Sequence, residues 1–474
     1  MRRHLSLPAI ALAMASPGFA TVAHGEAAVP DAGGVPTGPK TSPAAPGGSA
    51  CQDGVCKYRL SSEQLLAVAT RLVNEKKYSE AGFILSALKN APDMAVPYKF
   101  LEGMIALESG DAKSAAEQFR AILAERPGET RVRLELAKVL LAQGKLSAGD
   151  YHLRLAQNDK NLPEDIGRAI TNARSIIRSK KRWKFGFDFG FAPDTNINAA
   201  TSAQSVDINF GPTRLPVELD DAARARSGIG ITASVFGSVR LPVSPHTAIV
   251  ADLDANMVNY KGKDVDDYSG QLGIGLERRL GQNSTIALQG VSLYRWYGGR
   301  LAARQFGAKL SFQHDLSATR RIGFQLDGRH SDSDFGDGFT GWQIGLASTY
   351  EHVVAKSAIV SASIFARREA MDLAAYSSKT VGFNLGIGGE LPLGINAGVY
   401  GGISRAVYDA PQTFFSEDPR KDWRFQTRVY LGLRQIRVMG FSPSIEYNFS
   451  KVATNYTLYK STRHRAEFKI ARYF

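Results

Sequence analysis

Cysteine is nearly absent from this chain, which has two cysteines among 474 residues. So few thiols exclude a disulfide-rich scaffold and a zinc site built from several thiolates. The formal net charge of +13 excludes an acidic protein but identifies no partner, because nucleic acid, acidic lipid and an acidic protein would all suit it.

Recognisable catalytic motifs are also missing. The chain has no His-Glu-x-x-His, no Gly-x-Ser-x-Gly and no phosphate-binding Gly-Lys-Ser/Thr loop. Acidic clusters in "KDVDDY" and "SDSDFGDGF" could bind calcium at a loop, but they lack EF-hand spacing, and solvated loop acidity is the favoured interpretation. We therefore expect no enzyme, with no catalytic residue, no cofactor and no metal ion.

The N-terminus lacks an apolar run long enough to span a membrane. A charged start, Met1 to His4, precedes a short apolar stretch from Leu5 to Ala15 and then small residues. This order predicts a secretory signal peptide over residues 1–23. Export places the protein in an oxidising compartment, so we predict a local disulfide between Cys51 and Cys56.

Residues 24–57 form a tether rich in Pro, Gly and Ala, with few side chains that could build a core. Residues 58–181 are expected to form a helical repeat domain, in which residues 60 to about 160 repeat with a period of 34 and a further helix reaches to about Lys181. Small residues recur in two columns, large apolar residues recur in a third, and turns follow Lys76, Gly110 and Gly144. Pairs of antiparallel helices of the tetratricopeptide type produce this pattern, although an unrelated helical bundle would also be compatible.

Tetratricopeptide arrays hold peptides on the concave side, which is built from the first helix of each unit. By position in the repeat, five residues are candidates for passenger binding on that face: Phe100, Met104, Leu107, Arg131 and Lys138. Packing between repeats is an equal alternative for Phe100 and Leu107.

From residue 182 to 474 the period changes to two. The stretch "RWKFGFDFGFAPDTNIN" places an aromatic ring at every second position and Lys184 and Asp188 on the other face. Fourteen such strands are expected, around 184–192, 227–240, 247–260, 267–279, 284–297, 301–316, 320–330, 341–352, 358–368, 378–391, 395–408, 422–435, 441–449 and 463–474.

Short connections follow the even-numbered strands and mostly longer ones follow the odd-numbered strands. An even strand count with this alternation is typical of an outer-membrane barrel, whereas a soluble β-sandwich would have fewer strands. The fold class expected is α+β multidomain, with an N-terminal tetratricopeptide-type α-solenoid followed by a 14-stranded antiparallel transmembrane β-barrel. Both chain ends and the repeats would lie in the periplasm.

In a barrel the rings of the first strand face lipid, and charged residues face an aqueous lumen. Aromatic residues near strand ends would form interfacial girdles, among them Tyr260, Tyr268, Trp296, Trp342 and Trp423. The candidates for the lumen are Lys184, Asp188, Arg321, Arg329, Arg424, Arg428, Arg434, Arg463, Arg465 and Lys469. The cations among them could contact an acidic passenger, or they could pair with carboxylates such as Glu446 and Glu467 and brace the barrel.

A signal peptide, a short repeat array and a fourteen-strand barrel, in that order, resemble the surface lipoprotein assembly modulator (Slam) family. The stretch "KFGFDFGFAPDTNIN" is similar to that family's opening strand, and the resemblance covers about residues 60 to 474. It implies an outer-membrane translocon that moves a lipoprotein or a soluble haem-binding protein from the periplasm to the cell surface.

On this interpretation the repeats capture the passenger and the polar lumen lets charged segments pass. The expected partners are the passenger, outer-membrane lipid and the barrel assembly machinery, with no nucleic acid. An exopolysaccharide exporter and a passive porin-type channel are the alternatives. A porin needs no periplasmic repeats, and exporters of polysaccharide usually carry much longer arrays.

Overall fold

A computed structural model describes residues 50–52, 55–57, 60–159, 161–180, 182–210, 213–354, 357–433, 436 and 441–473. The expected signal peptide, most of the tether, Arg434 and the terminal Phe474 lie outside these residues. The chain divides into two compact units, one helical and one of strands, whose boundary along the sequence falls after Lys180. Each unit is described by itself.

A two-stranded hairpin precedes the helices. Its strands are β1 (Ala50–Gln52) and β2 (Val55–Lys57), and the backbone register places Cys51 opposite Cys56. A disulfide between these two residues stays a prediction.

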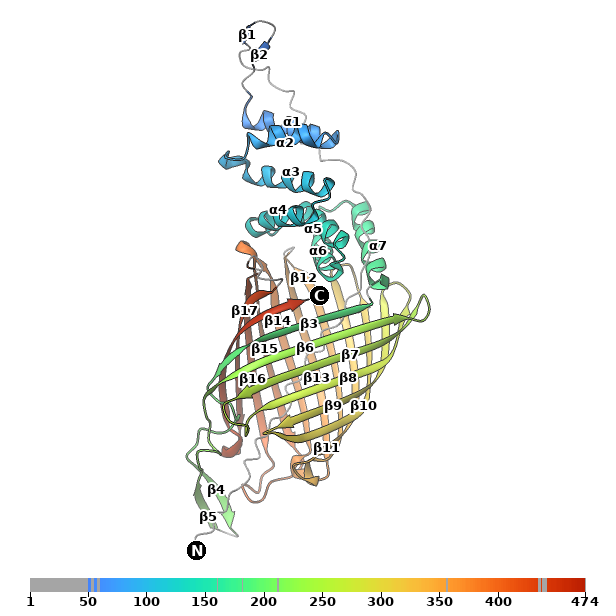
Figure 1. Cartoon of the computed structure of the whole chain (residues 1–474). Helices are drawn as coiled ribbons and strands as arrows, with labels where there is room; N and C mark the ends of the chain where they lie inside the picture. Colours follow the sequence, from blue (N-terminus) through green and yellow to red (C-terminus); the bar gives the residue numbers. More distant parts are fainter. Residues whose placement is uncertain are drawn as a thin grey trace. The chain divides into compact units, whose positions relative to one another are not determined.

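In the described part of the chain, six α-helices follow as three antiparallel pairs, and a seventh, α7, comes after them (Figure 1). Ser61 begins the first helix with a capping box, in which its hydroxyl accepts from the Gln64 backbone while the Gln64 side chain accepts from the Ser61 backbone. The elements are α1 (Ser62–Asn74), α2 (Tyr78–Ser86), η1 (Pro92–Met94), α3 (Ala95–Glu108), α4 (Ala112–Glu125), α5 (Thr130–Ala142), α6 (Leu146–Ala156) and α7 (Glu164–Lys180).

The turns between paired helices have the backbone conformation that their sequence signals predict. Lys76, Gly110 and Gly144 have φ of 59°, 84° and 70°, in the left-handed region that favours glycine. The same turn geometry therefore recurs in all three units, with a lysine occupying the position in the first.

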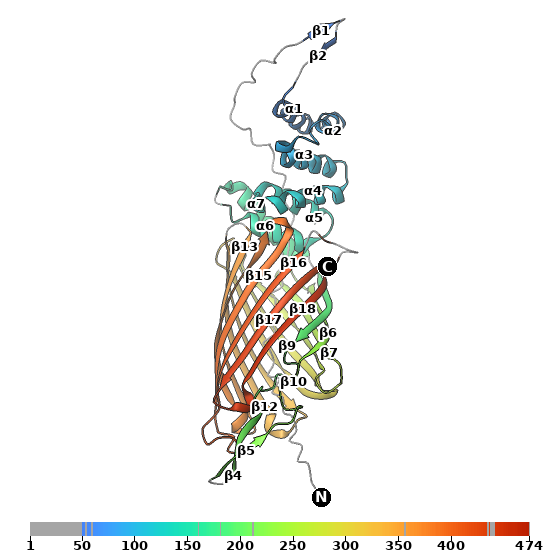
Figure 2. The same cartoon turned by 90° about the vertical axis from the view of Figure 1, so that its left-hand side faces the viewer.

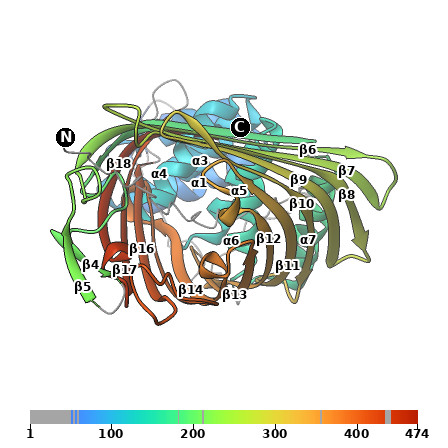
Figure 3. The ribbon, with the colours of Figure 1, turned by 90° about the horizontal axis from the view of Figure 1, so that it is seen from below.

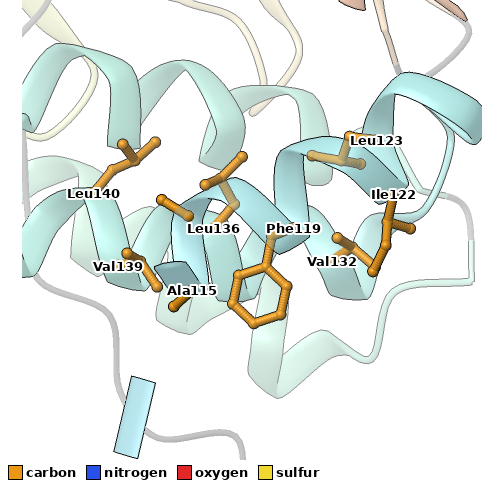
Figure 4. Packing of buried hydrophobic residues seen from close by; sticks show 9 residues of the cluster. Ala115, Phe119, Ile122, Leu123, Val132, Leu136, Val139 and Leu140 are labelled. Atoms are coloured by element: carbon orange, nitrogen blue, oxygen red, sulfur yellow. The ribbon is translucent and has the colours of Figure 1, made fainter. Parts of the chain in front are cut away.

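The repeat columns meet in the core between the helices (Figure 4). Ala69, Ala81, Ala115 and Ala137 have no exposed surface, and Phe119 is equally buried. Small side chains in two columns let neighbouring helices approach, and the large residue of the third column fills the space between them.

Gly103 lies against the Phe119 ring, and a Cβ at this position would come within 2.7 Å of Phe119 Cε1. We expect Gly103→Leu to overpack this core and to destabilise the helical unit by about 1–3 kcal/mol. Thermal unfolding of the full-length protein in detergent, followed by helical circular dichroism at 222 nm, measures the effect. Gly82→Leu is the matched control, because a Cβ at Gly82 in α2 meets nothing within 4 Å. Equal melting of the two variants would contradict the packing argument.

The second unit is a closed antiparallel barrel of fourteen strands (Figures 1 and 3), as the sequence predicts. The first strand, β3, closes the barrel against the last, β18. The strands are β3 (Trp183–Asp194), β6 (Gly228–Pro242), β7 (Thr247–Tyr260), β8 (Asp267–Leu280), β9 (Ser284–Tyr297), β10 (Arg300–Asp315), β11 (Arg320–Ser333), β12 (Gly341–Val354), β13 (Ala358–Met371), β14 (Ser378–Leu391), β15 (Ile395–Tyr408), β16 (Lys421–Leu433), β17 (Ser442–Thr454) and β18 (Ser461–Tyr473).

The long connection after β3 contains a hairpin that the sequence did not predict. It consists of β4 (Ser205–Phe210) and β5 (Thr213–Glu218), and it extends beyond the end of the barrel that carries the longer loops (Figures 1 and 2). The Asn209 backbone donates to the Phe414 carbonyl at 2.8 Å, so the hairpin is fixed to the loop between β15 and β16. Short connections lie at the other end of the barrel, including three residues between β8 and β9.

The outer face of the barrel is apolar. Trp183, Phe189 and Phe191 of β3 are 60%, 49% and 51% exposed, because their side chains point away from the closed wall. Phe187 has the same parity and packs edge-on against Phe441 at a ring distance of 5.2 Å. This alternation around the wall is the arrangement expected for strands surrounded by hydrocarbon.

Three of the tryptophans predicted for the girdles lie where the sequence places them. Trp296, Trp342 and Trp423 are exposed near strand ends. The assignment of Tyr260 to the girdle was wrong. Tyr260 is 5% exposed, and its hydroxyl donates to Asp194 at 2.9 Å. As the last residue of β7, Tyr260 has the inward parity, so its ring packs over Gly230 rather than against lipid.

Candidate transport site in the barrel and the repeats

Side-chain contacts between strands that are not neighbours identify the inner face of the barrel. Arg329 of β11 donates to Gln271 of β8 at 2.7 Å, although two strands separate them. Arg240 of β6 likewise donates to Glu277 of β8 at 2.7 Å. Such contacts are geometrically possible only on the concave side of a curved wall, so these residues line the lumen.

A network of charges crosses the junction of the first and last strands. Lys469 Nζ of β18 lies 2.7 Å from Glu467, 3.4 Å from Glu446 of β17 and 4.0 Å from Asp188 of β3. Arg465 adds a further ion pair to Glu467 at 3.0 Å. Three of the predicted lumen residues, Asp188, Arg465 and Lys469, are thus brought together by chain segments almost 300 residues apart.

Three more predicted cations are paired within the wall. Arg321 Nε lies 2.6 Å from Asp315, and Arg424 Nη2 lies 3.0 Å from Asp422. Arg329 Nε lies 3.4 Å from Asp327. Exposed fractions of 8%, 14% and 27% for the Arg321, Arg329 and Arg424 side chains leave little of these guanidinium groups to a passenger. Their contacts are those of the bracing alternative.

Two predicted lumen cations have looser surroundings. Lys184 Nζ lies over the Phe236 ring at 5.3 Å from its centroid. Arg428 lies 3.9 Å from Glu446, and its side chain is 46% exposed. These two side chains remain available to contact a passenger, and that role stays a prediction.

The residues predicted for the concave face of the repeats are partly buried. Phe100 and Met104 both pack against two core clusters, and Leu107 packs against one of them. Arg131 lies over the Phe100 ring at 5.3 Å, and Lys138 pairs with Glu135 at 3.3 Å. Arg131 and Phe100 are thus in contact across α3 and α5, and Phe100, Met104 and Leu107 all contribute to packing between repeats. A role of these five residues in passenger binding stays a prediction.

The acidic loop residues considered for calcium have protein partners. Arg304 lies 2.7 Å from Asp332 and 3.5 Å from Asp334, and Arg226 donates to Asp264. The Arg226 hydrogen bond holds the pKa of the Asp264 carboxyl below its ordinary value. Across the described residues, no group of three or more His, Cys, Asp or Glu side chains could hold a metal ion.

A buried cluster lies where β3, β7 and β18 meet at the loop end. The Asp194 side chain is fully buried and accepts from Arg463 Nη2 at 2.6 Å, from Tyr260 at 2.9 Å and from the Asn196 backbone at 2.9 Å. Asn196 Nδ2 then donates to the Ala200 carbonyl at 2.8 Å. Arg463, predicted as a lumen cation, therefore serves this cluster.

Comparison with known proteins gives the decisive finding. Residues 183–474 match the family described as surface lipoprotein assembly modifier. The chain belongs to this family. Residues 106–149 match the tetratricopeptide repeat. Both matches confirm what the opening strand and the period of 34 predict.

The relatives share low sequence identity with this chain, but the alignments cover most of both proteins. Surface lipoprotein assembly modifier 1 of Haemophilus influenzae is 20% identical over 378 residues, which cover 77% of this chain and 75% of that protein. The Pasteurella multocida surface lipoprotein assembly modifier is 19% identical, covering 81% and 78%. The hemophilin secretion modulator of Acinetobacter baumannii is 19% identical, covering 79% and 78%. Among solved structures, OmpF of Salmonella typhi aligns with a TM-score of 0.35 at 8% identity, covering 61% of this chain and 97% of that one.

The stretch that carried the resemblance to this assembly-modifier family has a clear structural task. Pro193 has no backbone N–H, and Ala466 and Glu467 lack partners in β3 along the described β18–β3 ladder. Asp194 and Asn196 lie directly beyond this gap and bind Arg463 and the Thr462 carbonyl of β18. The side chains of "PDTNIN" therefore stabilise the junction at which this barrel closes.

A second buried cluster was missed by sequence reasoning. Arg420 donates to Asp422 at 2.7 and 2.9 Å and to the Tyr408 hydroxyl at 2.8 Å. Its guanidinium also lies 3.8 Å from the centre of the Tyr459 ring. Arg420 and Asp422 are two residues apart at the start of β16, which was the available signal, but Tyr408 ends β15 and Tyr459 lies in the connection between β17 and β18. Within the described residues, no helix combines the length and apolar character required to cross a bilayer.

Proposed function

We propose that this protein is an outer-membrane translocon that moves a passenger protein from the periplasm to the cell surface. Membership of the surface lipoprotein assembly modifier family carries this proposal. The names of the relatives refer to surface lipoproteins and to secretion of hemophilin. The passenger of this chain is accordingly a lipoprotein or a soluble haem-binding protein.

The two units have separate tasks in this mechanism. The tetratricopeptide unit captures the passenger in the periplasm, with Arg131 and Phe100 on its binding surface. The barrel provides a polar route across hydrocarbon, so that charged segments avoid the cost of desolvation. No step requires a covalent reaction, and the protein acts without catalysis. Outer-membrane lipid surrounds the barrel, the barrel assembly machinery inserts it, and nucleic acid has no part.

Deletion of residues 60–181 separates capture from insertion. We expect the shortened chain to assemble as a barrel in the outer membrane but to display no passenger, because the capture unit is gone. Surface biotinylation of wild-type, deletion and null cells measures this, and proteins missing from the null surface identify the passenger. The same proteins should be missing in the deletion strain.

Heat-modifiable migration of the shortened chain in gels is the control for barrel assembly. Normal display by an assembled, shortened chain would refute the capture role. Loss of a surface polysaccharide, with surface proteins unchanged, would support a polysaccharide exporter instead.

A further inference from the structure

Arg428 differs from six other predicted lumen cations in its distance from the nearest carboxylate. Six described candidates have a carboxylate oxygen between 2.6 and 3.4 Å away: Arg321, Arg329, Arg424, Arg463, Arg465 and Lys469. Arg428 has its nearest carboxylate at 3.9 Å, beyond hydrogen-bond distance, and its side chain is 46% exposed. In the described part of the chain, Arg428 therefore has an ion-pair partner but no hydrogen-bonded carboxylate.

The carboxylate near Arg428 is already engaged by other groups. Glu446 accepts from Asn448 Nδ2 at 3.0 Å and from Lys469 Nζ at 3.4 Å. A guanidinium has five N–H donors, and nearly half of the Arg428 side chain surface is exposed. They are consequently available to a carboxylate supplied by another molecule.

Two tyrosine rings lie beside this guanidinium on the same wall. Tyr400 of β15 is opposite Arg428 of β16 in the strand register, and the Arg428 Cζ atom lies 5.3 Å from the Tyr400 ring centre. The Tyr400 and Tyr430 rings are stacked, with centroids 6.2 Å apart and an interplanar angle of 19°.

Glycines beneath the rings explain their orientation. A Cβ on Gly386 would come within 2.0 Å of the Tyr400 ring, and one on Gly398 would come within 2.4 Å of the Tyr430 ring. Both rings therefore lie flat on the wall, where a side chain at either glycine would force them away from it. Tyr400 and Tyr430 are each half-buried, so part of each ring remains open to the lumen.

We infer that Tyr400, Arg428 and Tyr430 form a binding patch for an extended, acidic polypeptide segment of the passenger in transit. The guanidinium binds carboxylates, and the flat rings contact side chains and peptide groups of a chain lying along the wall. Tyr400 and Arg428 lie near the middle of their strands and Tyr430 lies two residues further along β16, at a depth that every transported segment must pass. This inference rests on the proposed function, because it assumes that the polypeptide travels through the lumen.

Binding of defined probes to the full-length protein in detergent tests the patch. The acidic probe is a fluorescein-labelled, unstructured peptide of Glu, Gly and Ser, and the basic probe has Lys in place of each Glu. Fluorescence anisotropy should show tighter binding of the acidic probe. Arg428→Gln, and Tyr400→Ala combined with Tyr430→Ala, should each weaken acidic-probe binding by about tenfold. Asp254→Asn, at an exposed lumen position on β7, five strands around the barrel from β16, should not weaken it.

Each result is decisive for a different claim. Equal binding of the two probes to wild type, or unchanged acidic-probe binding in both patch variants, would overturn the inference even if passenger display is normal. If acidic-probe binding depends on the patch but wild-type and null cells display the same surface proteins, the patch is preserved and the proposed function is refuted. Heat-modifiable migration of each variant shows that its barrel has folded.

Discussion

Replacing Phe187 and Phe189 together by lysine is expected to abolish insertion of the barrel into the outer membrane. Both residues belong to β3 and share the outward parity, and Phe189 is 49% exposed on that face. A lysine facing lipid near mid-bilayer costs about 2–4 kcal/mol at each site. The combined free-energy cost of two such charges approaches the whole stability of an ordinary domain, which is about 5–15 kcal/mol. Outer-membrane fractionation and heat-modifiable migration measure the loss.

Gln426→Lys is the matched control, because Gln426 of β16 faces the lumen and donates to Asn384 at 3.2 Å. A charge at that position remains hydrated, so the control should assemble like wild type. Assembly of the Phe187→Lys, Phe189→Lys variant at wild-type levels would mean that the aromatic face of β3 is not the lipid face.

The barrel could be predicted from sequence because the period of two is a local property. Each strand must present apolar side chains to lipid, so the residues of "KFGFDFGF" indicate their faces without reference to any other strand. The repeats were predictable for a similar reason, since the small residues Ala69, Gly103 and Ala137 recur where helices must approach.

Interactions within the lumen could not be predicted in this way. Parity shows that Arg428 and Arg463 both point inward, but only the strand register determines that Arg463 meets a buried Asp194 while Arg428 meets an already engaged Glu446. Tyr260 was misplaced because its position near a strand end suits a girdle equally well. The β4–β5 hairpin lies in a loop, where no membrane imposes a pattern.

Charge pairing in the lumen changes how the net charge of +13 should be interpreted. Most described lumen cations have a carboxylate within hydrogen-bond distance, so the basic excess does not make the lumen a uniformly basic channel. A wall with balanced charge stays hydrated without holding a charged passenger tightly along its whole length. Specific contact is then confined to places where the pairing is incomplete, and Arg428 is such a place.

Asp194→Ala is expected to destabilise barrel closure by about 3–5 kcal/mol, because removing one partner leaves the Arg463 charge buried and unpaired. The substitution also removes the acceptor for Tyr260 and for the Asn196 backbone, beside a strand junction that Pro193 already interrupts. Heat-modifiable migration should convert at a clearly lower temperature than in wild type. Asp264→Ala is the control, since Asp264 is 57% exposed and pairs with Arg226 at the same end of the barrel. An exposed pair contributes about 0–1 kcal/mol, so this variant should convert at nearly the wild-type temperature.

A double variant distinguishes the effect of losing the charge pair from the effect of losing side-chain packing. Asp194→Leu combined with Arg463→Met removes both charges, and it should be more stable than the sum of the two single changes predicts. Strict additivity would mean that the Asp194–Arg463 pair does not hold the junction, and that closure depends on the backbone ladder from Phe468 onward. Recovery in the double variant would instead show that this site provides electrostatic compensation beside the gap in the described ladder between the first and last strands.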